Sequence, residues 1–151
     1  MILYADSSAL VKYYLDEPDS PVCRALIDRA EAIGTSEIAR AEVSAAVAKA
    51  LRLGLVLRTQ AEEALKCFRV EWPDYARVPV TEQLVARADQ LAWEQALRGY
   101  DAVHLAAALM WRETVAAATL ILTYDRELAR AARAVGIMAL PELPLSAHEA
   151  T

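Results

Sequence analysis

Hydrophobic residues along this chain form two alternating patterns. Short apolar runs, typical of buried strands, occur at residues 2–5, 32–35, 76–80, 119–124 and 137–140. Between them, apolar residues recur every three or four positions, which indicates amphipathic helices. Residues 36–54, for example, place Val43, Val47 and Leu51 on one stripe and end at Gly54. Pro79 marks the third run as an edge strand, because proline donates no ladder hydrogen bond.

Strands that alternate with helices predict an α/β fold. We expect a doubly wound domain, with a central parallel sheet of about five strands and helices on both faces. Such folds bind ligands beyond the carboxyl ends of the strands, where the strand order reverses. With 151 residues, 56% of them hydrophobic, the chain has material for one compact core. We assign residues 1–140 to this domain and 141–151 to a C-terminal tail.

Charge and cysteine content narrow the class of protein. The net charge of −5 argues against a broad basic surface for nucleic acid. Cys23 and Cys67 are isolated, so neither a disulfide framework nor a zinc knuckle is expected. The first residues lack a basic lead, Asp6 interrupts their apolar run, and no apolar stretch is long enough for a bilayer. These features predict a cytoplasmic protein without a membrane segment.

Acidic residues stand at positions that the predicted fold brings close together. Asp6 and Asp125 follow directly after the strands at 2–5 and 119–124, so neighbouring strands would place both carboxylates in one crevice. Asp101 opens the apolar segment "DAVHLAAAL", and Glu42 borders the apolar stripe of its helix. Carboxylates in such a cluster repel one another and are best accommodated around a hard cation. Ligation by oxygen alone favours Mg²⁺, with Mn²⁺ as the alternative.

Each acid also has a simpler structural interpretation. Asp6, Asp101 and Asp125 stand where aspartate commonly caps a helix. Glu42 alone is typical of a solvated helix residue. His104, one turn after Asp101, is expected to be a partly buried residue that pairs locally rather than a metal ligand.

Four segments, taken together and in order, resemble a known family. They are "MILYADSSALVKYYLDEP", "TSEIARAEVSAAVAKALRLG", "LRGYDAVHLAAAL" and "LILTYDRELARAARAVGI". In sequence and spacing they are similar to PIN-domain proteins, and more narrowly to the VapC-type toxins of bacterial and archaeal toxin–antitoxin pairs. The resemblance covers about residues 1–140. It implies a PIN-like domain that hydrolyses RNA phosphodiester bonds as a metal-dependent endoribonuclease, leaving a 5′-phosphate and a 3′-hydroxyl.

The resemblance also implies roles for individual residues. The acids of the family match Asp6, Glu42, Asp101 and Asp125, and the hydroxyl found two residues after the first acid matches Ser8. Asp6 and Asp101 would be the principal metal ligands, and Asp125 would complete the shell or support a second ion. Glu42 would join the metal site and orient or deprotonate the attacking water. Ser8 would hydrogen-bond a ligand carboxylate. Expected partners are RNA, a cognate antitoxin and a second copy in a homodimer.

Other phosphoryl chemistries fit less well. A phosphatase of the haloacid-dehalogenase type needs a second aspartate two residues after the first, and Ser8 stands there. A phosphoacceptor receiver domain needs an aspartate closing its third strand, where this chain reads "VPVT". One alternative of a different class remains. It is a catalytically idle PIN-like binding module that keeps its acids as helix caps.

Overall fold

The computed structural model describes residues 1–142, and the remaining residues of the expected tail, 143–151, lie outside it. The described residues form five strands: β1 (Ile2–Ala5), β2 (Ala32–Ser36), β3 (Ala76–Val78), β4 (Thr119–Leu122) and β5 (Ala139–Leu140). They also form α1 (Ser7–Tyr14), α2 (Ser20–Asp28), α3 (Ala39–Arg52), α4 (Arg58–Glu71), α5 (Glu82–Gln95), α6 (Gly99–Val115) and α7 (Arg126–Ala134), with a 3₁₀ turn at Trp72–Asp74. Among residues 1–142, no helix is long and apolar enough to cross a membrane.

The strands make one parallel sheet in the order β3-β2-β1-β4-β5. This confirms the predicted α/β class, the five strands and the edge position of the strand before Pro79. The chain adds β2 and β3 on one side of β1, then returns to add β4 and β5 on the other side. The strand order therefore reverses between β1 and β4, which pair from Ile2–Thr119 to Ala5–Leu122.

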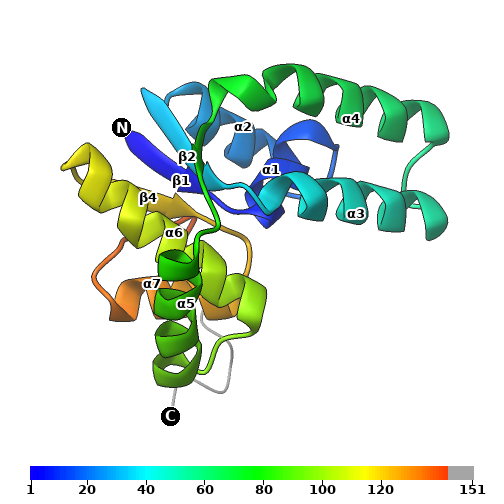
Figure 1. Cartoon of the computed structure of the whole chain (residues 1–151). Coiled ribbons are helices and arrows are strands. Elements are labelled where there is room, and N and C mark those ends of the chain that lie inside the picture. Colours follow the sequence, from blue (N-terminus) through cyan, green and yellow to red (C-terminus); the bar gives the residue numbers. More distant parts are fainter. Residues whose placement is uncertain (143–151) are drawn as a thin grey trace, which may run out of the picture.

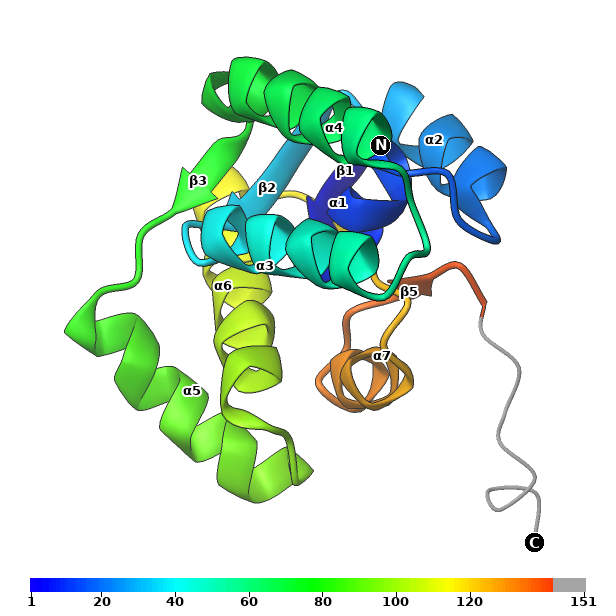
Figure 2. The same ribbon diagram turned by 90° about the vertical axis from the view of Figure 1, so that its right-hand side faces the viewer.

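Helices cover both faces of the sheet, as predicted. In Figure 2, α1 to α4 gather in the upper part of the molecule, around and in front of β1 and β2, whereas α5, α6 and α7 lie in the lower part. Successive side chains of β1 point to opposite faces of the sheet. Leu3 and Ala5 belong to the core between the sheet and α1 to α4, whereas Tyr4 belongs to the core between the sheet and α5 to α7. Figure 1 shows α3 starting where β2 ends, so α3 also begins at the carboxyl edge of the sheet.

Helix α6 is buried because its residues are small where the sheet lies closest. Ala102 and the segment from His104 to Leu109 are buried, and the alanines among them let the helix approach the strands. Near its other end, Trp111 packs against Gly34 of β2, where an added Cβ would lie 2.6 Å from the indole ring. These contacts fix how α6 is rotated about its axis, and so fix the direction of its first turn.

Candidate active site at the carboxyl edge of the sheet

The predicted acidic residues occupy the edge where the strand order reverses. Asp6 and Asp125 follow the ends of β1 and β4 and serve as the N-caps of α1 and α7. Glu42 lies in the first turn of α3, and Asp101 lies in the first turn of α6. The four side chains therefore come from both helix layers and from the two strands at the switch point.

Asp6 is held rigidly and is almost fully buried, with 3% of its surface exposed. Its Oδ1 accepts hydrogen bonds from the Ser8 hydroxyl at 2.7 Å and the Ala9 backbone N–H at 3.0 Å. Its Oδ2 accepts one from the Thr123 hydroxyl at 2.7 Å. Burial raises the pKa of Asp6, while these three hydrogen bonds act in the opposite direction.

Two hydroxyl groups join the loops that follow β1 and β4. Ser8 Oγ accepts a hydrogen bond from the Tyr124 backbone N–H at 2.8 Å, in addition to donating to Asp6. Thr123 Oγ1 accepts one from the Asp125 backbone N–H at 3.0 Å. The hydrogen bond from Ser8 to a carboxylate was expected from the sequence. The hydrogen bond from Thr123 was not expected, because the sequence does not show that the end of β4 lies beside Asp6.

Arg98 spans two of the acids. Its Nε donates to Asp101 Oδ2 at 2.9 Å, and its Nη2 donates to Asp125 Oδ2 at 2.8 Å. Asp125 uses its other oxygen, Oδ1, to accept the Leu128 backbone N–H at 2.8 Å and so caps α7. Sequence analysis missed Arg98, although its position three residues before Asp101 is a helical spacing at which side chains meet. The guanidinium is solvent-exposed and lies at the mouth of the site.

The simple capping interpretation is correct for Asp6 and Asp125 and wrong for Asp101. Helix α6 begins at Gly99 after the N-cap residue Arg98, so Asp101 lies inside the first turn and makes no capping hydrogen bond. Burial raises the pKa of Asp101 and the nearby Asp125 raises it further, against the influence of Arg98. Because no backbone bond explains this half-buried carboxylate, the cap alternative no longer accounts for its presence.

Glu42 is tied to α6 by a buried histidine. Its Oε1 lies 2.6 Å from Nε2 of His104, and Nδ1 of that ring lies 2.9 Å from the Tyr4 hydroxyl. The prediction that His104 pairs locally was wrong, since its partners are 62 and 100 residues away along the chain. The cause is the packing of α6, which directs His104 across the sheet edge rather than toward solvent.

The carboxylates of the site are suited to a hard divalent cation, but Arg98 already pairs with two of them. Asp6, Asp101 and Asp125 supply only carboxylate oxygens, and burial raises the pKa values of Asp6 and Asp101, which disfavours their ionised forms in the absence of a cation. Within residues 1–142, however, no three acidic, histidine or cysteine side chains are gathered closely enough to hold an ion. Arg98 acts as the counter-cation of Asp101 and Asp125, so a metal ion bound there would have to displace it.

Comparison with known proteins identifies the family of this chain and agrees with its fold. Residues 3–134 match the PIN domain family. The chain is 34% identical to Ribonuclease VapC45 of Mycobacterium tuberculosis over 140 residues, 93% of this chain and 95% of the relative. The toxin–antitoxin complex from Klebsiella pneumoniae is similar in fold, with a TM-score of 0.64 and 15% identity over 96% of this chain and all of that one. The structure of FitAcB from Neisseria gonorrhoeae is also similar in fold, with a TM-score of 0.64 and 20% identity. The match covers 93% of this chain and 97% of that one. The chain belongs to the PIN domain family.

Proposed function

We propose that this protein is an endoribonuclease that hydrolyses RNA phosphodiester bonds with Mg²⁺, and that it is the toxin of a type II toxin–antitoxin pair. Mn²⁺ is the alternative ion. Membership of the PIN domain family and identity to a relative named as a ribonuclease support the reaction class. The observation that carries the proposal is the set of carboxylates at the switch point, above all Asp101, which caps no helix and pairs with the side chain of Arg98.

Asp6, Asp101 and Asp125 are the residues that would hold the ion. Bound there, a divalent cation would lower the pKa of water and screen the charge that develops on the phosphate. Asp6 supplies a fixed point, because Ser8, Ala9 and Thr123 determine its orientation. This rigidity would give a bound ion one ligand of fixed position at the end of β1.

Glu42 and Arg98 would act on the substrate side. Glu42 is partly exposed and would accept a proton from the attacking water through the oxygen that His104 leaves free. Arg98 already pairs with two carboxylates, and an exposed guanidinium fits phosphate oxygens equally well. With a cation beside Asp101 and Asp125, Arg98 would no longer be needed as their partner and would be able to contact RNA.

The proposed partners are a cognate antitoxin and a second copy of this chain, in the cytoplasm. The similar structures include a toxin–antitoxin complex, which supports an antitoxin partner. The contacts of Arg98 also show that one guanidinium bridges Asp101 and Asp125. An arginine from an antitoxin segment would meet the same oxygens and would compete with the metal ion.

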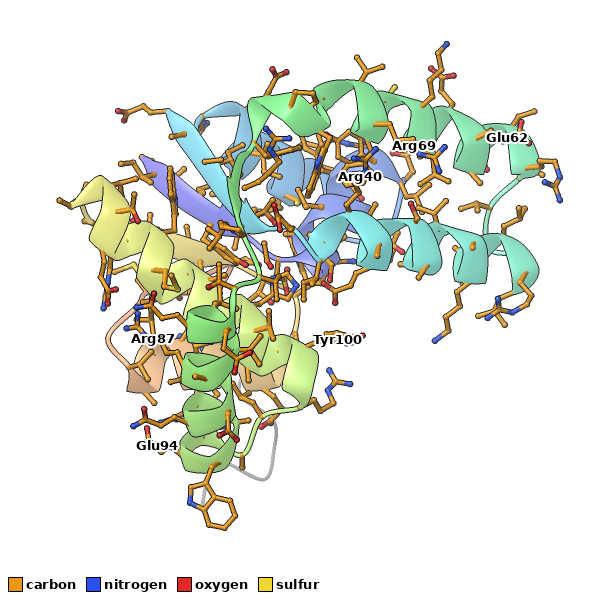
Figure 3. The ribbon with its side chains drawn as sticks, in the orientation of Figure 1. Arg40, Glu62, Arg69, Arg87, Glu94 and Tyr100 are labelled. Atoms are coloured by element: carbon orange, nitrogen blue, oxygen red, sulfur yellow. The ribbon has the colours of Figure 1, made fainter. Side chains whose placement is uncertain are left out.

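A catalytically idle binding module is the second candidate, and the caps made by Asp6 and Asp125 favour it. An assay of RNA cleavage separates the two. Protein freed of any antitoxin should cleave RNA with Mg²⁺ or Mn²⁺, and excess EDTA should stop it. Glu42→Gln should be inactive. Glu62→Gln changes an exposed residue near the N-terminal end of α4 (Figure 3) and should leave cleavage normal. Cleavage at an equal rate in excess EDTA would rule out the metal mechanism, and no cleavage under any condition would favour the binding module.

A further inference from the structure

A buried hydrogen-bonded chain connects β1 to Glu42. It runs from the Tyr4 hydroxyl to Nδ1 of His104 and from Nε2 of His104 to Oε1 of Glu42. The exposed fractions of Tyr4 and His104 are 0% and 1%. These residues come from β1, α6 and α3, and Figure 2 shows α6 reaching the first turn of α3. The chain thus links the two helix layers at the proposed site.

The chemistry of the end groups determines which atoms donate. A carboxylate only accepts hydrogen bonds, so the proton between His104 and Glu42 belongs to Nε2. The Tyr4 hydroxyl is fully buried, and its proton requires an acceptor, which Nδ1 provides when it carries no proton. Burial, together with Asp6 and Glu42, raises the pKa of Tyr4, so this hydroxyl remains protonated. The hydrogen bonds therefore assign Nε2 as the donor to Glu42 and Nδ1 as the acceptor of the Tyr4 hydroxyl.

Glu42 depends on this ring for its orientation. Among the described residues, His104 is the only hydrogen-bond partner recorded for the Glu42 carboxylate. A glutamate in the first turn of a helix otherwise samples several rotamers and loses side-chain entropy when it is fixed. The bond at Oε1 fixes one oxygen and leaves Oε2 available. The rigid element that supplies the bond is α6, which also carries Asp101.

We propose that Tyr4 and His104 are positioning residues for Glu42. Tyr4 holds the His104 ring in place by donating to Nδ1, and His104 holds one Glu42 oxygen so that the other faces the proposed site. The inference rests on the proposed function, since it concerns how one of its acids is oriented. It adds two residues that touch neither RNA nor an ion, one of them at the centre of the sheet.

Core packing alone is the competing explanation. A buried tyrosine and a buried histidine would satisfy each other's polar atoms without any role for Glu42. Removing the Tyr4 hydroxyl separates these explanations, because Tyr4→Phe keeps the ring and its packing. A matched control is Tyr75→Phe. Tyr75 is also buried, and its hydroxyl lies 2.6 Å from that of Tyr14, in the other core.

The first measurement is the tautomer of His104, read from nitrogen chemical shifts of its ring in the metal-free protein. Wild type and Tyr75→Phe should show a single form protonated at Nε2. Tyr4→Phe should keep the proton on Nε2, where Glu42 still accepts it, but its Nδ1 resonance should shift, because this nitrogen has lost the hydroxyl that donates to it. An unchanged Nδ1 resonance in Tyr4→Phe would overturn the role of Tyr4, whether or not the protein cleaves RNA.

The second measurement is RNA cleavage by the folded variants. Tyr4→Phe should lower kcat by about ten-fold with KM unchanged, in the range for lost partners that orient a functional group. Tyr75→Phe should match wild type. His104→Gln keeps an N–H at the place of Nε2 and should retain more kcat than His104→Leu. Equal losses in these two variants, or a loss in Tyr75→Phe as large as in Tyr4→Phe, would overturn the proposal. If the wild type is inactive, only the proposed function is refuted. The nitrogen chemical shifts of His104 would still decide the role of Tyr4.

Discussion

The acids of the site fall into two pairs that differ in what else they do. Asp6 and Asp125 follow strand ends and cap helices, with backbone N–H groups at 3.0 and 2.8 Å. Glu42 and Asp101 lie inside the first turns of α3 and α6, and within the described chain they are held only by side chains, His104 and Arg98. The first pair therefore contributes to folding as well as to the site. The second pair allows the chemistry to be tested almost separately from the fold.

The largest expected effect on stability follows from removing Asp6. Asp6→Ala eliminates the cap of α1 and leaves the buried Thr123 hydroxyl without its acceptor. The loss should lower the free energy of unfolding by roughly 2–4 kcal/mol. Glu42→Gln, by contrast, should cost about 1 kcal/mol or less, because the amide oxygen still accepts from His104. Urea unfolding of both variants measures these losses in the free energy of unfolding. Equal losses in Asp6→Ala and Glu42→Gln would contradict the division of the acids into two pairs.

A smaller effect distinguishes the pairs through pH. Because the pKa of Asp101 in the folded protein is raised above its ordinary value of 3.8, the fold favours the protonated form. Its contribution to stability is therefore complete below pH 3.8 and is lost as the pH rises through the raised pKa. Metal-free Asp101→Asn should gain stability relative to wild type across this rise, measured as urea midpoints at successive pH values. Asp89→Asn, an exposed change on α5, should follow wild type. A relative loss for Asp101→Asn would show that its charge supports the fold.

The smallest expected effect concerns Arg98. Since its guanidinium pairs with Asp101 and Asp125, Arg98→Ala should strengthen Mn²⁺ binding by roughly two- to five-fold, the range that exposed ion pairs allow. Calorimetric titration without RNA measures this directly. Arg87→Ala is a matched control, because Arg87 also pairs with a carboxylate, Glu113, in a contact between α5 and α6. Weaker binding in Arg98→Ala would mean that the arginine assists the ion rather than competing with it.

The same division explains what the sequence could predict. Alternating periods of hydrophobicity identified the strands, and the end of a strand located Asp6 and Asp125, because both signals are local. The sequence identifies Asp101 as a candidate site residue, but the prediction that it caps α6 was wrong. The helix begins two residues earlier, at Gly99, and this start depends on how the helix packs. The partners of Glu42 were not predictable. The contact between Tyr4 and His104 joins positions 100 residues apart and depends on the rotation of α6 over β1.

If these carboxylates bind a divalent ion that supports RNA hydrolysis, Asp101→Asn removes one of its ligands and should impair cleavage. RNA cleavage should be measured for wild type, Asp101→Asn and Asp89→Asn over a range of Mg²⁺ concentrations, with folding checked by circular dichroism. We predict that wild type and Asp89→Asn cleave in proportion to bound Mg²⁺. Folded Asp101→Asn should be slower by at least about 100-fold, as the loss of a ligand to a catalytic ion implies. Cleavage by Asp101→Asn at the wild-type rate, with the same dependence on Mg²⁺, would contradict the account.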